Sequence, residues 1–380
     1  MMNWARQQLA NVTGTPEPIY GPSAIRSIAT QAETTPFTLL EKDDVKWVDM
    51  ESTSVETQTF YLHAESGHVG IVQVIHSNVV GLRRTSQFNT KIFYPKNDPK
   101  PPLWSADQLF DVGFSEDKLN FYASSCAIEI SEDGKQYTVK STSNENSIVN
   151  LTISQIAPGF QVGKDGKTLY GTNMSSPWGS MRHTFWPRNK VEGLIVTKDG
   201  PINFKGLCLF VHALQGMKPH HAAAKWNFVN FQGTKYTAIM MEFTTPKSYG
   251  STTVNVGGIV HDNEITMASA SNIISYTKVR CDEDNKWLVP ESAKYEWIEK
   301  TDKGEKVQAV IEGSLGERPD RIDVMAEVPV FVKQIVAGAV GTKPYIYQFI
   351  VENSTLSIKN GEEVIVEEGQ LFTEASFISE

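Results

Sequence analysis

Short segments in which apolar and polar residues alternate recur along most of this chain and constrain it to β structure. In residues 149–154, Val, Leu and Ile alternate with Asn, Thr and Ser, which predicts a strand with one buried face and one solvent-exposed face. Asp133-Gly134 and Asn360-Gly361 each separate two such segments, and these dipeptides favour the positive φ angles of hairpin turns. Regularly spaced strands with almost no long helical period predict an all-β chain of antiparallel barrels or sandwiches.

The length of 380 residues is sufficient for two ordinary domains. Four prolines among small polar residues predict an extended linker after the first residues, and a break between two series of strands is predicted near residues 215–219. Residues 105–110 form the only other plausible helical turn of note. The expected parts are a membrane-binding helix at 1–14, a linker at 15–41, an N-terminal β domain at 42–216 and a C-terminal β domain at 217–380.

The first twelve residues predict a short amphipathic helix, because their apolar side chains fall within an arc of roughly 100°. The residues expected to contact a membrane are Met1, Met2, Trp4, Ala5, Leu9 and Val12. So short a helix is marginal in water and needs a surface on which to fold, so its membrane attachment should be weak and reversible. The alternative is a terminal helix that docks on its own protein.

The charge pattern argues against a nucleic-acid partner. The net charge is −9, and no block rich in lysine or arginine offers a stripe for phosphates. The amino-terminal segment lacks the uninterrupted apolar region of a signal peptide, so we expect a cytosolic protein.

No metal or cofactor is expected. Cys126, Cys208 and Cys281 are odd in number and far apart, which makes a disulfide framework or a zinc site implausible. His220-His221 resembles a ligand pair, but adjacent side chains on a strand point to opposite faces. The sequence has no HExxH, GxSxG or Walker motif and no dinucleotide-binding glycine pattern.

Two segments rich in polar and aromatic residues, 178–189 and 212–227, are the candidates for a binding site. The side chains expected to contact a lipid are Arg182, His183, Trp186, Arg188, Asn189, His220, His221 and Trp226. We expect them to converge where the two domains meet, because the mouth of an apolar pocket needs apolar bodies with polar tips. The structural alternative is that these segments close the end of a barrel, with arginine stacked on tryptophan and donating hydrogen bonds to the carbonyls at the strand ends.

Several stretches together resemble the fungal survival factor family. The resemblance runs from the amino-terminal helix to residues 256–258 and is most distinctive at 58–61, 68–78, 157–160, 177–183, 213–231 and 242–252. It implies a double calycin, in which two lipocalin-like antiparallel β-barrels lie side by side behind the short amino-terminal helix.

The resemblance also implies a non-enzymatic carrier that moves ceramide between the endoplasmic reticulum and the early Golgi. Its expected roles are sphingolipid homeostasis and survival under oxidative and cold stress. In that family the amino-terminal helix attaches to membranes with the help of acetylation; the start Met1-Met2 leaves the native first residue open. The expected location is the cytoplasm, at the surface of both membranes, with the nucleus as a further alternative. The family supplies no catalytic residues, and the sequence leaves open which barrel holds the lipid.

The competing hypothesis is an enzyme, because double calycins include hydratases and cyclases that act on isoprenoids or polyketides. In that case His183 or Glu242 would serve as a general acid, with Trp186 and Trp226 facing a cation. A protein that only mediates stress interactions is the third possibility. A sphingolipid that co-purifies intact would favour the carrier, and turnover of an isoprenoid or polyketide the enzyme.

Overall fold

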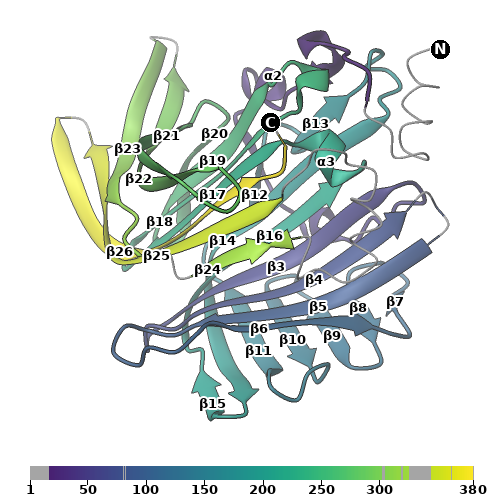
Figure 1. Ribbon diagram of the computed structural model, residues 1–380, viewed down its shortest axis with the longest axis vertical. Helices are drawn as coiled ribbons and strands as arrows, with labels where there is room; N and C mark the ends of the chain where they lie inside the picture. Colours follow the sequence, from purple (N-terminus) through teal and green to yellow (C-terminus); the bar gives the residue numbers. More distant parts are fainter. Residues whose placement is uncertain are drawn as a thin grey trace. The chain divides into compact units, whose positions relative to one another are not determined.

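The computed structural model describes residues 17–79, 81, 83–301, 304–317, 320–324, 344–360 and 362–379, and most of these lie in β-strands (Figure 1). Two antiparallel sheets organise the strands, which confirms the all-β fold class. The predicted membrane helix, including Met1 to Val12, lies outside the described residues. Within these ranges no helix is both long and apolar enough to cross a bilayer.

The chain divides into two compact units. The first unit contains residues 39–161 and 182–216, and the second contains the described residues up to Thr38 together with 162–181 and 217–379. The predicted boundary near 216 coincides with the start of the last of these segments. The second unit also takes in a piece of the region that we assigned to the N-terminal domain.

The first unit is built on a sheet with the order β6-β5-β4-β3-β16-β14-β11-β10-β9-β8-β7. Its strands are β3 (Ser54–Ala64), β4 (Val69–Val79), β5 (Arg83–Phe93), β6 (Leu103–Leu109), β7 (Gly113–Phe114), β8 (Phe121–Ala123), β9 (Cys126–Ile130), β10 (Gln136–Ser141), β11 (Ile148–Gln155), β14 (Gly179–Thr197), β15 (Gly200–Asn203) and β16 (Gly206–Gln215), with the 3-10 turn η2 (Lys42–Val45) before them. The sheet folds back, so that β3 to β6 form one wall and β8 to β11 the other (Figure 1). A hydrogen bond from the Ser124 amide to the Phe110 carbonyl, 3.0 Å long, helps to close it.

Alternation and turn chemistry place these strands as the sequence predicts. Val149, Leu151 and Ile153 on β11 are buried, whereas the residues between them are more exposed. Gly134 has a φ of 69° in the turn between β9 and β10, a conformation that glycine adopts without steric cost. The helical turn predicted at 105–110 is wrong: these residues lie largely in β6, where the ladder with β5 supplies the backbone hydrogen bonds that so short a helix could not maintain alone.

Aromatic side chains fill the interior of the first unit. The rings of Phe60 and Phe210 lie 5.0 Å apart, and those of Tyr137 and Trp186 lie 4.9 Å apart. Trp47 packs in the same core and is buried. This interior is a packed hydrophobic core.

The second unit is built on a sheet with the order β20-β19-β18-β17-β26-β25-β23-β22-β21. Its strands are β17 (Lys225–Gly233), β18 (Tyr236–Thr244), β19 (Thr253–His261), β20 (Glu264–Ser269), β21 (Ile273–Cys281), β22 (Leu288–Thr301), β23 (Gly304–Ser314), β24 (Asp320–Asp323), β25 (Tyr345–Asn360) and β26 (Glu363–Phe377). The sheet curls until β20 contacts β22, and the indole nitrogen of Trp297 on β22 donates a 2.9 Å hydrogen bond to the Ile239 carbonyl on β18.

The stretch predicted as a linker carries short elements in its described part. These are the 3-10 turn η1 (Pro22–Ala24), β1 (Ile25–Arg26), α2 (Ala29–Ala32) and β2 (Phe37–Leu39), and the related short elements elsewhere are β12 (Phe160–Val162), β13 (Lys167–Tyr170), α3 (Pro219–Ala222) and the 3-10 turn η3 (Lys247–Tyr249). Ile25 pairs with Tyr170 on β13, and the Ile28 amide donates to the Thr168 hydroxyl over 3.0 Å. The prolines prevent long elements, but they do not prevent short pairings with a strand distant in the sequence.

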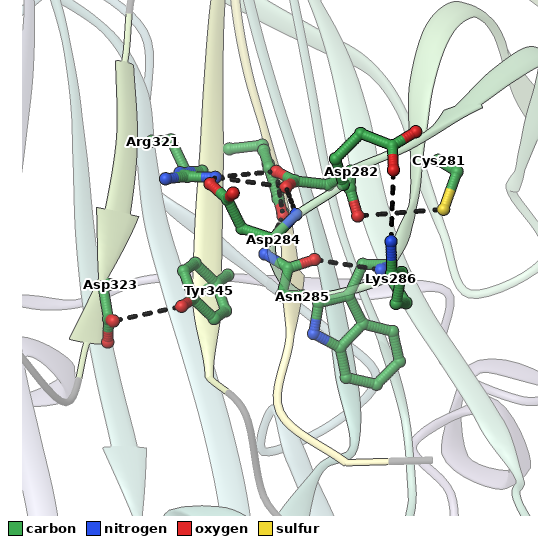
Figure 2. Close-up of polar contacts among 11 residues, drawn as sticks. Cys281, Asp282, Asp284, Asn285, Lys286, Arg321, Asp323 and Tyr345 are labelled. Carbon is green, nitrogen blue, oxygen red and sulfur yellow. Dashed lines mark hydrogen bonds and ion pairs between the residues drawn. The ribbon is translucent and has the colours of Figure 1, made fainter.

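A cluster around Arg321 fastens the turn between β21 and β22 to β24 and β25 (Figure 2). Its guanidinium nitrogen Nη1 lies 3.1 Å from both carboxylate oxygens of Asp282 and 2.6 Å from an oxygen of Asp284. The Tyr347 hydroxyl donates to the same Asp282 carboxylate over 2.9 Å. Burial raises the pKa of Asp282, but the bonds from Tyr347 and Arg321 outweigh it and the net shift is downward. The carboxylate therefore stays charged and holds the turn in place.

Candidate functional site

Five of the eight predicted lipid contacts lie on one strand. The 19-residue β14 carries Arg182, His183, Trp186, Arg188 and Asn189, so this segment is a continuous part of the sheet. Trp186 lies in the core of the first unit. The Asn189 amide nitrogen donates to the carbonyls of Trp186 and Cys208, each over 2.8 Å. Both side chains are thus held by contacts within the protein, and their role in lipid binding stays a prediction.

The other predicted contacts on β14 are also held by the protein. Burial lowers the pKa of His183 to about 4, so its ring is neutral at physiological pH, and it stacks on Phe185 with 6.4 Å between ring centroids. Arg182 donates to the Gln161 side-chain oxygen over 3.0 Å and lies 3.5 Å from an oxygen of Asp44. Arg188 is buried, and its carbonyl accepts bonds from two backbone amides.

His220 and His221 lie on the short helix α3, which Pro219 begins, and not on a strand as we assumed. Their rings therefore contact each other, 4.3 Å apart, in place of pointing to opposite faces. Burial lowers the pKa of His220 to about 4, and burial together with His220 and Lys218 lowers that of His221 to about 2. The described part of the chain holds no group of three His, Cys, Asp or Glu side chains that could bind a metal.

Trp226, the last predicted contact, is half-buried on β17 and packs against Phe243 with 5.0 Å between ring centroids. It lies in the second unit with His220 and His221, whereas the β14 residues lie in the first. The convergence of the two groups therefore stays a prediction.

The second unit contains cavities that the sequence did not indicate. A cavity of about 450 Å³ lies between the β18–β19–β20 hairpins and the ends of β22, β23, β25 and β26. Its apolar lining is Ile259, Met267, Ile358 and Ile365, and its polar lining is Tyr236, His261, Thr266, Glu299, Gln308 and Lys359. The Tyr236 and His261 rings stack at 4.4 Å, and the Gln308 amide donates to the Glu299 carboxylate. We call this the large cavity.

A second cavity, of about 360 Å³, lies beside α2. It shares Thr266, Met267 and Glu299 with the large cavity, and Phe37 and Ser271 also line it. A third cavity, of about 200 Å³, is set in the wall between β23 and β25. Concave, largely apolar surfaces with a few polar groups are the usual form of a small-molecule site. No sequence motif marks the residues that line these cavities, because they come from separate strands and each is an ordinary strand position.

Glu242 is a further buried carboxyl group in the second unit. The Asn227 and Asn255 amides each donate to it over 3.1 Å, and the Tyr276 hydroxyl donates to Asn227. Burial raises the pKa of Glu242, and the two amide bonds only partly offset that effect. It is thus a group that can hold a proton, as the enzyme hypothesis requires.

Comparison with known proteins identifies the family. The model of the Svf1 family matches residues 2–379. The ceramide-binding protein svf-1 of Neurospora crassa is 58% identical over 381 residues, and the ceramide-binding protein svf1 of Aspergillus fumigatus is 50% identical over 397 residues. In both cases the alignment covers 100% of each chain.

Among solved structures, the crystal structure of kievitone hydratase from Nectria haematococca is similar with a TM-score of 0.54 and 12% identity, covering 96% of this chain and 99% of the hydratase. At that identity the likeness concerns the fold alone. The full-length sequence matches confirm the resemblance noted from the sequence and show that the chain belongs to the Svf1 family.

Proposed function

We propose that this protein is a non-enzymatic carrier that binds ceramide in the cavities of its second unit. The observation that carries the proposal is the 58% identity, over the full length of both chains, to a protein named ceramide-binding. Ceramide has two long chains and a small uncharged head with an amide and hydroxyls. The large cavity and the cavity beside α2 offer that combination of apolar wall and scattered polar groups.

The choice of the second unit rests on the large cavity and the cavity beside α2, which lie in it next to a core that is itself packed. Aromatic rings of Trp47, Phe60, Tyr137 and Trp186 fill the core of the first unit, and a ligand would have to displace them. Displacing such a ring costs about 3–5 kcal/mol, the usual cost of losing a large core side chain. The eight residues predicted from the sequence remain the competing location.

We further propose that the carrier works between the endoplasmic reticulum and the Golgi from the cytoplasm, and so supports sphingolipid homeostasis and survival of oxidative stress. A weak amphipathic helix at residues 1–12 would let it touch a bilayer and leave again. The support for this part is the family resemblance and the apolar arc of that segment.

The experiment is to purify the full chain from its own cells and identify the bound lipid by mass spectrometry. Ceramide at a fixed ratio to protein is the expected result. A second assay measures transfer of ceramide from donor to acceptor vesicles, which the protein should accelerate. A protein that carries no sphingolipid and transfers none would contradict the proposal.

One observation favours a second candidate function, a hydratase or cyclase acting on an apolar isoprenoid or polyketide. The buried Glu242 has a raised pKa, and a protonated carboxyl could transfer its proton to an alkene. Glu242→Gln would abolish such a reaction by removing the acidic proton. The same change should leave ceramide binding intact if the protein is a carrier.

A further inference from the structure

The wall of the second sheet is interrupted between β23 and β25. In the described residues, their ladder consists of two registered pairs, Ala309 with Ile358 and Val310 with Ser357. β24 then continues along β25, beginning with the pair of Asp320 and Gln348. Between these ladders β23 separates from β25, although it stays paired with β22 as far as Ser314.

The same part of β25 is also irregular on its other side. Its register with β26 shifts between Val351 and Ser354, which leaves Glu352 and Asn353 outside the ladder. Irregularities of this kind bend a strand and interrupt pairing, and they occur preferentially at rims and near functional sites. The same part of β25 therefore departs from regular pairing on both sides, toward β23 and toward β26.

The cavity of about 200 Å³ lies at this interruption, and we call it the wall opening. Its floor is apolar and reaches the interior of the sheet, since Tyr295, Ile311 and Leu371 belong to the buried core. The opening is thus a recess in the sheet whose floor is formed by the apolar core.

The rim of the wall opening is polar. Asn353, Ser354 and Thr355 line it, and the described residues provide no hydrogen-bond partner for these three side chains. Ser354 is 7% exposed, so its hydroxyl lies inside the opening. Side-chain hydroxyls and an amide that bond no group of the protein can bond a polar ligand.

The charge of the lining selects among lipid head groups. Among the described residues that line the opening, Glu312 is the only ionisable one apart from the phenol of Tyr295, and none is cationic. A phosphate head would find no positive partner there and would face a carboxylate. An uncharged head with hydroxyls and an amide can pair with the hydroxyls, with Asn353 and with Glu312.

The volume limits which part of a lipid can be enclosed. Pockets that bury a whole drug-sized ligand measure about 300–1,000 Å³, so a cavity of about 200 Å³ accepts a head group and not two long chains. We infer that the wall opening binds the neutral amide and hydroxyl head group of a ceramide-class lipid. This inference rests on the proposed function and adds the site and the selectivity against phospholipids.

The test measures extraction of ceramide by the full chain from sucrose-loaded phosphatidylcholine vesicles that contain long-chain ceramide. After the vesicles are pelleted, mass spectrometry quantifies ceramide in the supernatant. Ser354→Leu fills the wall opening with an apolar side chain. Ser275→Leu on β21 is the matched control, because Ser275 is not among the described residues that line the three cavities. We expect Ser354→Leu to lower extraction at least tenfold, Ser275→Leu to change it less than twofold, and phosphatidylcholine to stay in the vesicles.

Each result decides between the two proposals. Normal extraction by Ser354→Leu, or an equal loss with Ser275→Leu, would overturn the wall opening while leaving the carrier function intact. A parent protein that extracts no ceramide would overturn both. If thermal unfolding shows that Ser354→Leu does not fold, Thr355→Ala decides: loss of one hydrogen bond should weaken extraction about threefold to tenfold, and no change would refute the site.

Discussion

His212 Nε2 lies 2.8 Å from Glu56 Oε1 in the interior of the first unit, although 156 residues separate them in the chain. Both side chains are less than 4% exposed. The Glu56 carboxylate also accepts hydrogen bonds from the amides of Val48 and Asp49, 2.8 and 2.9 Å long. The pair ties β3 and β16 to the segment that enters the unit, and both of its side chains are buried.

Glu56→Gln should destabilise the first unit by about 1–3 kcal/mol, because the amide nitrogen of Gln would replace an oxygen that now accepts a buried hydrogen bond. Chemical denaturation monitored by tryptophan fluorescence measures the change. Glu192→Gln is the matched control, because it breaks the exposed pair between Lys190 and Glu192, 2.8 Å apart, and should cost less than about 1 kcal/mol. Equal effects of the two changes would show that the buried pair does not stabilise the unit.

The free energy of unfolding should decrease in two separate ranges as the pH is lowered. Burial lowers the pKa of His183 to about 4 from 6.5, so the stability that its neutral form provides is present above pH 6.5 and is lost as the pH falls toward 4. Burial raises the pKa of Glu56, but the bond and charge of His212 outweigh it, and the net shift below 4.5 puts its loss at lower pH. In denaturation curves at several pH values, His183→Asn should reduce the loss of stability in the first range, to which His220 and His221 also contribute, and Glu56→Gln should reduce it in the second. An unchanged pH profile of either variant would contradict the assignment of its range.

Leu9→Asp with Val12→Asp should abolish flotation of the protein with liposomes, because the two carboxylates fall within the apolar arc of the predicted helix. The melting temperature should stay that of the parent. Replacing Gln7 and Asn11 by aspartate adds the same charge outside the arc and serves as the control. If the Leu9/Val12 variant still floats, the helix docks on the protein and does not attach it to membranes.

Trp226→Ala and Trp186→Ala should have opposite profiles. Trp226 is half-buried, so its loss should spare the fold and reduce ceramide extraction if the predicted lipid contact is correct. Trp186 lies in the core beside Tyr137, so its loss should cost about 3–5 kcal/mol of stability. Normal extraction by a folded Trp226→Ala protein would exclude Trp226 from the lipid site.

The three cysteines should differ in reactivity but not in importance for folding. Cys281 is exposed, whereas Cys126 and Cys208 are buried, and burial raises the pKa of the Cys126 thiol to about 12. A thiol reagent should therefore label Cys281 at once and the other two only after unfolding. Cys281→Ser should remove the fast phase without affecting lipid binding. Loss of stress protection in that variant, with lipid binding intact, would identify Cys281 as an oxidant sensor.

Local chemistry accounts for what the sequence predicted well. The alternation of residues 149–154 and the glycine of the turn at 133–134 act within a few positions, so their consequences can be recognised without a partner strand. Ser105 to Phe110 were misassigned because their strand depends on pairing with β5, and His220 and His221 because a four-residue helix leaves almost no periodic signal.

The sequence by itself determined the fold class and the family, since both depend on patterns repeated over many residues. Tertiary structure alone decided which polar groups became buried together, as with Glu56 and His212. It also decided where the second sheet opens, because the wall opening combines residues of β22, β23, β25 and β26 that no spacing relates. Burial and cavity shape are properties of distant segments brought into contact, so they exist only once the sheets have curled.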